Sequence, residues 1–323
     1  MLALDGGGAK ALFTAHVLAR LEADLGICVA DSFDLIAGTS AGGIIALGLG
    51  AGMRPAEIVD TYLDMSARVF PPYRRARWRY VTSRAWSPAY SADVLKDTLT
   101  EVFGTRVLGD SAKRLVIPSW DVQRGEVHIF KTPHHERLRR DWRISMVDVA
   151  MATAAAPTYF RAATVDGQRL IDGGIWANNP SVVAIGEAIS MLGVGVGSIR
   201  VLNIGAVDQR TNHPERLDTG GWATWAKAAA PLMITASSRG AQGTAMHLIG
   251  QENFARFDAM VPGDVFTLDR ASPEALAGLA AGQSRFLSPV YKAKFADHLA
   301  GSYVPILGPG VAQATPTPHG NRS

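Results

Sequence analysis

Short apolar runs followed by glycine-rich turns and helical patterns recur along this chain. The first run, residues 2–4, leads into Asp5-Gly6-Gly7-Gly8 and then into apolar residues that repeat with helical period from 11 to 25. The second run, residues 33–37, leads into Gly38-Thr39-Ser40-Ala41-Gly42 and a small-residue helix ending near residue 50. The pattern predicts two strand-loop-helix units of the same construction.

The alternation continues beyond these two units. Helices are predicted at residues 55–65, 92–103, 145–155 and 180–191, and strands at 114–120, 127–131, 168–171 and 199–204. Residues 219–300 have a mostly helical pattern, interrupted by a strand-like stretch at 254–260 and by Pro273 and Pro289. Alternating elements favour a three-layer α/β fold with a central, largely parallel sheet flanked by helices.

Composition narrows the class of protein. With 323 residues, 47% of them hydrophobic and 19% charged, the chain is not intrinsically disordered. The same composition is typical of a folded globular protein. We expect one domain over residues 1–306 and a flexible tail over residues 307–323. The sequence predicts no secretory leader, because no positively charged stretch precedes the apolar run at residues 2–4. It predicts no transmembrane segment either, because its longest uncharged apolar window, residues 35–53, carries six glycines. The single cysteine, Cys28, excludes an internal disulfide and favours a reducing compartment.

The turn at residues 38–42 fits the nucleophile-elbow pattern, in which a serine stands on a sharp turn between a strand and a helix. Side chains at Gly38 and Gly42 would collide with neighbouring elements, and the helix start favours a developing negative charge. Ser40 is therefore a candidate nucleophile. Taken alone, the pattern also fits a small-residue turn without function.

The triple glycine could supply the other half of an acyl-transfer site. Backbone N–H groups at Gly6, Gly7 and Gly8 can face a ligand without obstruction from Cβ atoms, and the amide of Ala41 follows the candidate nucleophile. The same stretch fits a weaker dinucleotide-binding pattern. That pattern requires an acidic residue at the end of the second strand, where the elbow stands instead, so a dinucleotide-binding oxidoreductase is the weaker alternative.

Two kinds of base could activate the serine. In a Ser-His-Asp triad of the α/β-hydrolase type, the histidine would be His213, His247 or His298, none of which lies in a motif. Asp172 instead ends a short strand before Gly173-Gly174, a setting that can present its carboxylate over a pocket. The residues alone leave both bases open.

Three of these segments together resemble a known family. Asp5-Gly6-Gly7-Gly8, Gly38-Thr39-Ser40-Ala41-Gly42 and Asp172-Gly173-Gly174, in this order, look like the three motifs of the patatin-like phospholipases, over at least residues 2–205. The resemblance implies a dyad of Ser40 and Asp172 without histidine, an oxyanion hole from the glycine loop, and no metal or cofactor. The family loop usually closes with glycine where this chain has Ala11.

A basic and aromatic segment occupies residues 65–92, with six arginines and no acidic residue. Within it, residues 68–86 are predicted to contact lipid headgroups and to form a lid over Ser40. The alternatives are a solvated loop and, less favoured, a stretch that binds nucleic acid or a nucleotide. The candidate headgroup and interface residues are Lys10, Arg74, Arg75, Arg77, Trp78 and Arg79.

Residues 224–258, with Ser237-Ser238 and His247-Leu248-Ile249-Gly250, are similar to bacterial patatin-like effectors of antiphage signalling. This resemblance implies a cyclic oligonucleotide activator, a membrane phospholipid substrate and a cytoplasmic protein acting at the inner membrane, with no nucleic-acid polymer as partner. The sequence leaves the oligomeric state open. A catalytically silent lipid or nucleotide sensor is the remaining alternative.

Overall fold

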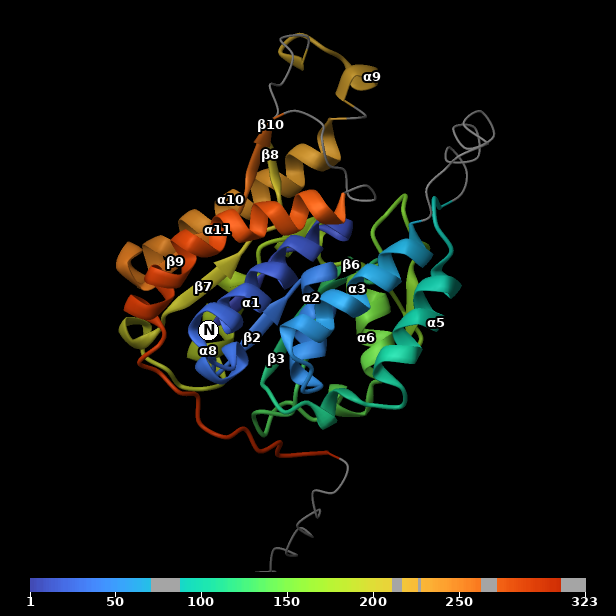
Figure 1. The fold of residues 1–323 in the computed structure, drawn as a ribbon. Helices are drawn as coiled ribbons and strands as arrows, with labels where there is room; N and C mark the ends of the chain where they lie inside the picture. Colours follow the sequence, from blue (N-terminus) through green and yellow to red (C-terminus); the bar gives the residue numbers. More distant parts are fainter. Residues whose placement is uncertain (71–87, 211–216, 226–227, 263–271, 309–323) are drawn as a thin grey trace, which may run out of the picture.

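The computed structural model describes residues 1–70, 88–210, 217–225, 228–262 and 272–308, and within them an eight-stranded sheet forms the centre of the molecule (Figure 1). The strand order is β5-β6-β3-β2-β1-β7-β9, with β4 paired to β3. The strands are β1 (Leu2–Leu4), β2 (Ile36–Gly38), β3 (Leu115–Asp121), β4 (Glu126–Lys131), β5 (Ala163–Val165), β6 (Gln168–Asp172), β7 (Val201–Ile204) and β9 (Phe254–Phe257). The pairs β2–β1, β1–β7, β7–β9 and β2–β3 are parallel, which confirms the predicted α/β architecture.

Helices cover both faces of the sheet. In β1, Leu2 and Leu4 pack into the core beneath α1, α2, α3 and α11, whereas Ala3 faces α8 and α10. This alternation is the period of two expected of a strand buried on both sides. The α-helices are α1 (Ala11–Leu25), α2 (Ala41–Gly50), α3 (Pro55–Val69), α5 (Ala92–Phe103), α6 (Met146–Thr153), α7 (Gly174–Ala177), α8 (Ser181–Ser190), α9 (Trp222–Trp225), α10 (Ala229–Ile249) and α11 (Pro273–Lys294). Short 3-10 helices are Gly8–Lys10, Val29–Ser32, Leu108–Asp110, Asp141–Arg143, Val196–Ser198 and Gln251–Asn253.

Strands β2 and β6 meet end to end along one edge of β3. Val116 pairs with β2 on one side and with β4 on the other, and Ser119 pairs with β6 on one side and again with β4 on the other. The edge of β3 opposite β4 is therefore shared, first by β2, which runs parallel to β3, and then by β6, which runs antiparallel. As a result the carboxyl ends of β2 and β6 point toward each other.

Some details differ from the sequence expectations. Helix α11 begins at Pro273 but runs through Pro289, where a break was expected; Leu287 and Tyr291, both fully buried, hold the helix against the core on either side of the proline. A small parallel pair, β8 (Asp208–Arg210) with β10 (Met260–Pro262), was not predicted. The extent of a single domain over residues 1–306 stays a prediction, and most of the expected tail, residues 309–323, lies outside the described residues.

Candidate active site

Ser40 stands on the turn between β2 and α2 in a backbone conformation that is rare for a residue with a side chain. Its φ is 56° and its ψ is −127°. Its N–H donates to Thr153 Oγ1 at 2.9 Å, and the Thr153 hydroxyl in turn donates to the carbonyl of Pro118 at 2.7 Å. Strain of this kind persists only where surrounding contacts impose it and is concentrated at functional sites. The backbone at Ser40 therefore has the sharp strand-to-helix turn of the predicted nucleophile elbow.

Gly42 shows why the elbow needs small residues. A Cβ at this position would lie 2.5 Å from the carbonyl oxygen of Leu4 and 2.6 Å from that of Asp5. Both are backbone atoms at the end of β1, so neither can move away cheaply. Helix α2 therefore starts in direct contact with the strand that leads into the glycine loop, and Ser40 is brought beside that loop.

Asp172 ends β6 opposite Ser40. The Ser40 hydroxyl donates to Asp172 Oδ2 at 2.6 Å, and the N–H of Gly174 donates to Asp172 Oδ1 at 2.7 Å. The backbone of Asp172 is fixed as well, because its N–H donates to the carbonyl of Ala155 at 3.1 Å. The end-to-end arrangement of β2 and β6 thus brings together two side chains that lie 132 positions apart in the sequence.

The environment of Asp172 makes it a weaker acid. Only 5% of the residue is exposed, and the described donors to its carboxylate, the Ser40 hydroxyl and the Gly174 N–H, are neutral. Burial raises the pKa of Asp172 from 3.8 to about 6, although the hydrogen bonds from Ser40 and Gly174 lower it in part. A carboxylate with such a pKa is ionised at neutral pH and is a stronger base than an exposed aspartate.

The glycine loop approaches Ser40 closely. A Cβ on Gly6 would lie 3.2 Å from the Ser40 Cβ and 2.5 Å from Asn178 Oδ1. The N–H of Gly6 donates to the carbonyl of Asn178 at 3.0 Å, so this amide is already engaged. Among the described residues, no acceptor is found for the N–H groups of Gly7, Gly8 and Ala41. Of the predicted oxyanion-hole amides, these three can therefore donate to a bound oxyanion, whereas the Gly6 amide holds the loop in place.

The other predicted residues have the following surroundings. Gly38 and Gly173 lie against backbone, beside Gly42 and Pro118 respectively. Lys10 donates from Nζ to the carbonyl of Val207 at 3.0 Å. The predicted interface residues Arg74, Arg75, Arg77, Trp78 and Arg79 lie outside the described residues, as do residues 71–87 of the predicted lid. At the start of the lid, Arg68 lies in α3 and forms an ion pair with Glu101 at 2.6 Å.

The described histidine candidates do not contact the dyad. His298 pairs with Asp34, with 2.8 Å between Nε2 and Oδ2, and His247 is exposed on α10. In the described part of the chain, no histidine forms a hydrogen bond with Ser40 or Asp172. His213 lies outside the described residues.

Two residues that the sequence analysis missed support the site, namely Thr153 and Asn178. Thr153 contacts Ser40 and Pro118, and Asn178 contacts Gly6; these partners lie far away in the sequence, so no local pattern points to either residue. The described residues hold no group of three or more His, Cys, Asp or Glu side chains suited to a metal ion. Among the same residues, no helix combines the length and the apolar character that crossing a lipid bilayer requires.

Comparison with known proteins agrees with the motifs. A cGAMP-activated phospholipase of Pseudomonas aeruginosa is 36% identical over 281 residues, which cover 84% of this chain and 83% of the relative. A protein of the same name from Vibrio cholerae is 32% identical over 314 residues, covering 87% of this chain and 88% of the relative. A cUMP-AMP-activated phospholipase of Escherichia coli is 34% identical over 218 residues, covering 64% and 63%. A family model described as patatin-like phospholipase matches residues 2–185, and the chain belongs to this family.

Proposed function

We propose that this protein is a serine lipid acyl hydrolase that cleaves carboxylic ester bonds of glycerophospholipids, with Ser40 as nucleophile and Asp172 as general base. The observation that carries the proposal is the 2.6 Å hydrogen bond from the Ser40 hydroxyl to Asp172 Oδ2 on a strained strand-to-helix turn. Family membership and the names of the relatives, which are phospholipases, support the substrate class.

The geometry fits a two-step reaction. Asp172 takes the Ser40 proton as Oγ attacks the ester carbonyl carbon, and the N–H groups of Gly7, Gly8 and Ala41 face the negative oxygen that forms. Collapse of this intermediate breaks the ester bond, and Asp172 returns the proton to the leaving alcohol oxygen. Water then attacks the acyl-enzyme, giving its proton to Asp172; the fatty acid leaves, and the proton returns to Ser40.

We infer further that a cyclic dinucleotide switches this activity on. The support is the likeness to relatives named for activation by cGAMP and by cUMP-AMP. The same proposal includes three further predictions. The protein acts at the cytoplasmic side of the inner membrane, and it contacts lipid headgroups through Lys10 and the arginines of residues 74–79. It also takes part in defence against phage.

The test measures fatty acid release from phosphatidylglycerol and phosphatidylethanolamine vesicles, with and without 3′,3′-cGAMP or cUMP-AMP, together with labelling by a fluorophosphonate. We expect release and labelling in the wild type, and loss of release in Ser40→Ala and Asp172→Asn. Binding of a cyclic dinucleotide without release or labelling under any condition would identify a silent sensor instead. An NAD-dependent thermal shift without labelling would favour the oxidoreductase.

A further inference from the structure

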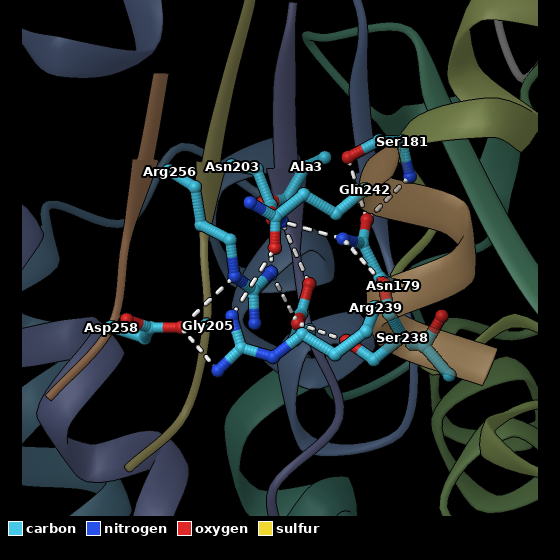
Figure 2. A network of polar contacts seen from close by, with 12 residues as sticks. Ala3, Asn179, Ser181, Asn203, Gly205, Ser238, Arg239, Gln242, Arg256 and Asp258 are labelled. Atoms are coloured by element: carbon cyan, nitrogen blue, oxygen red, sulfur yellow. Dashed lines mark hydrogen bonds and ion pairs between the residues drawn. The ribbon is translucent and has the colours of Figure 1, made fainter. Parts of the chain in front are cut away.

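A buried ion pair holds the start of the glycine loop. Asp5, the last residue before the three glycines, is 2% exposed and accepts from Arg256 Nη1 at 2.8 Å. Its carboxylate also accepts from Asn203 Nδ2 at 2.7 Å and from the Ser238 hydroxyl at 3.1 Å. Arg256 continues the network to Asp258 through Nε at 3.0 Å, and Figure 2 shows these side chains converging from β7, α10 and β9.

The partners of Asp5 come from outside the segment that the family model matches. The family model matches residues 2–185, whereas Asn203, Ser238 and Arg256 all lie beyond residue 185. The C-terminal part of this chain therefore contacts a catalytic motif through a buried charge. Removing one partner of a buried pair leaves the other charge uncompensated, so this contact has large consequences when it is broken.

Helix α10 also contacts the segment that follows the general base. Ser237 donates to the carbonyl of Trp176 at 2.9 Å, and Asn179 Nδ2 donates to the carbonyl of Ser238 at 3.5 Å and to Asn203 Oδ1 at 3.0 Å. One turn of α10 thus touches both the start of the glycine loop and the chain after Asp172. It connects the two sides of the site from outside, and Figure 2 shows its contact with Asn179 at Ser238.

The glycine loop needs such anchors because its own residues constrain it little. Glycine has the widest range of backbone conformations, so three in succession do not hold two amides in one orientation by themselves. The loop is fixed at Gly6 by Asn178, at the carbonyl of Gly7 by the N–H of Lys10, and at the carbonyl of Gly8 by the Tyr62 hydroxyl at 2.6 Å. The Asp5 carboxylate fixes its beginning.

We propose that Arg256 and Ser238 are positioning residues for the oxyanion hole, which they orient through the Asp5 carboxylate. The inference rests on the proposed acyl-transfer function and adds residues that act without touching substrate. Burial raises the pKa of Asp5, and the Arg256 charge with the Asn203 and Ser238 hydrogen bonds opposes this shift. Loss of Arg256 would therefore favour a neutral Asp5 or a displaced one, and either changes the start of the loop.

The main test compares Arg256→Gln with wild type on a soluble short-chain p-nitrophenyl ester and in the rate of fluorophosphonate labelling. Both reactions place negative charge on an oxygen that the loop amides face. We expect kcat and the labelling rate to fall by about 10- to 100-fold. Misplacing a catalytic group by about 1 Å costs up to about 100-fold, and the loss of a whole oxyanion donor, which this variant does not remove, costs about 100- to 1,000-fold. KM for the small ester and the pH midpoint of the rate should stay unchanged, because the dyad is intact.

Lys131→Gln is the matched control for a general loss of stability. Lys131 Nζ forms a buried ion pair with Glu187 Oε2, and His134 contacts the other carboxylate oxygen. In the sheet, Lys131 pairs with Val116, three residues before the position of β3 that pairs with Asp172. This variant should lose thermal stability and keep kcat. Arg256→Lys should recover part of kcat, because an ammonium can pair with Asp5 but cannot reproduce the two-sided contact of a guanidinium.

Ser238→Ala keeps the inference testable if Arg256→Gln does not fold. It removes one neutral hydrogen bond to Asp5, and we expect kcat to fall by about 3- to 10-fold, the equivalent of a typical hydrogen bond. Ser284→Ala, which removes a buried hydroxyl that donates to the Ala281 carbonyl within α11, should leave kcat unchanged. Wild-type kcat in a folded Arg256→Gln variant, or in Ser238→Ala, would overturn the inference. An inactive and unlabelled wild type would instead refute the proposed function.

Discussion

Replacing Asp172 by asparagine should abolish hydrolysis and at the same time stabilise the protein. The wild-type carboxyl has its pKa raised from 3.8 to about 6 by burial. With about 1.4 kcal/mol for each tenfold change in an equilibrium constant, ionising it costs the folded state about 3 kcal/mol. Asparagine avoids this cost and keeps both contacts, because its oxygen can accept from Gly174 and its NH₂ can donate to Ser40.

The size of this stabilisation depends on pH. Above pH 6 the wild-type carboxyl is charged in both states, and the folded protein bears the full cost. Below pH 3.8 it is neutral in both states, and the cost disappears. The free energy of unfolding of Asp172→Asn should therefore exceed that of wild type by about 3 kcal/mol at pH 8 and by about 1 kcal/mol at pH 4.5. For a chain of this length, the difference at pH 8 corresponds to a Tm higher by about 4 °C.

Urea unfolding and thermal scans at both pH values measure this difference, with Asp121→Asn as the control. Asp121 is also buried, but its Oδ1 accepts from the N–H groups of Gln123 and Arg124 at 2.8 and 3.1 Å, and its Oδ2 lies 3.8 Å from Arg124 Nε. Asparagine removes the negative charge that these three donors favour, so this replacement should destabilise the protein. If Asp172→Asn were no more stable than wild type at pH 8, or if the difference did not change with pH, the reasoning about an uncompensated buried carboxylate would be refuted.

The same pKa predicts that kcat/KM on a soluble ester rises with pH to a plateau, with a midpoint of about 6; a pH profile without a step in this region would exclude Asp172 as the base. Gly42→Ala should lower the free energy of unfolding by about 1–3 kcal/mol, because the methyl group would overlap the carbonyl oxygens of Leu4 and Asp5, whereas Gly186→Ala, with open space around it on α8, should be neutral or stabilising in the same denaturation assay. His247→Gln and His298→Gln should keep wild-type turnover of the ester; complete loss of turnover in a folded variant of either would favour a triad over the dyad.

The parts of the site that lie in local patterns could be predicted from the sequence. The glycine loop and the elbow each follow a short apolar run and open a helix, and this order of elements is visible over about fifteen residues. Asp172 could be proposed as the base because a strand ends there and two glycines follow, and the family resemblance favoured it over the histidines. Its contact with Ser40 could be seen only in the folded structure.

The supporting residues could not be predicted, because each depends on a long-range contact. Thr153 looks like any other residue of a small-residue helix until the end of α6 is placed beside Pro118 and Ser40. Arg256 lies in a short strand 251 positions from Asp5, and only the parallel pairing of β9 with β7 brings it there. The break expected at Pro289 was wrong because burial of the neighbouring side chains outweighed the local preference of proline.

The meeting of β2 and β6 on β3 has a consequence for how this site tolerates changes in chain length. Insertions or deletions in the loops between Ser40 and β6 need not alter the gap between hydroxyl and carboxylate, as long as both strands keep their alignment on β3. A slip of β6 by a single residue, in contrast, would carry the carboxylate about 3.3 Å along the edge and turn it to the opposite face. The proposed catalytic dyad therefore depends on strand registry far more than on loop length.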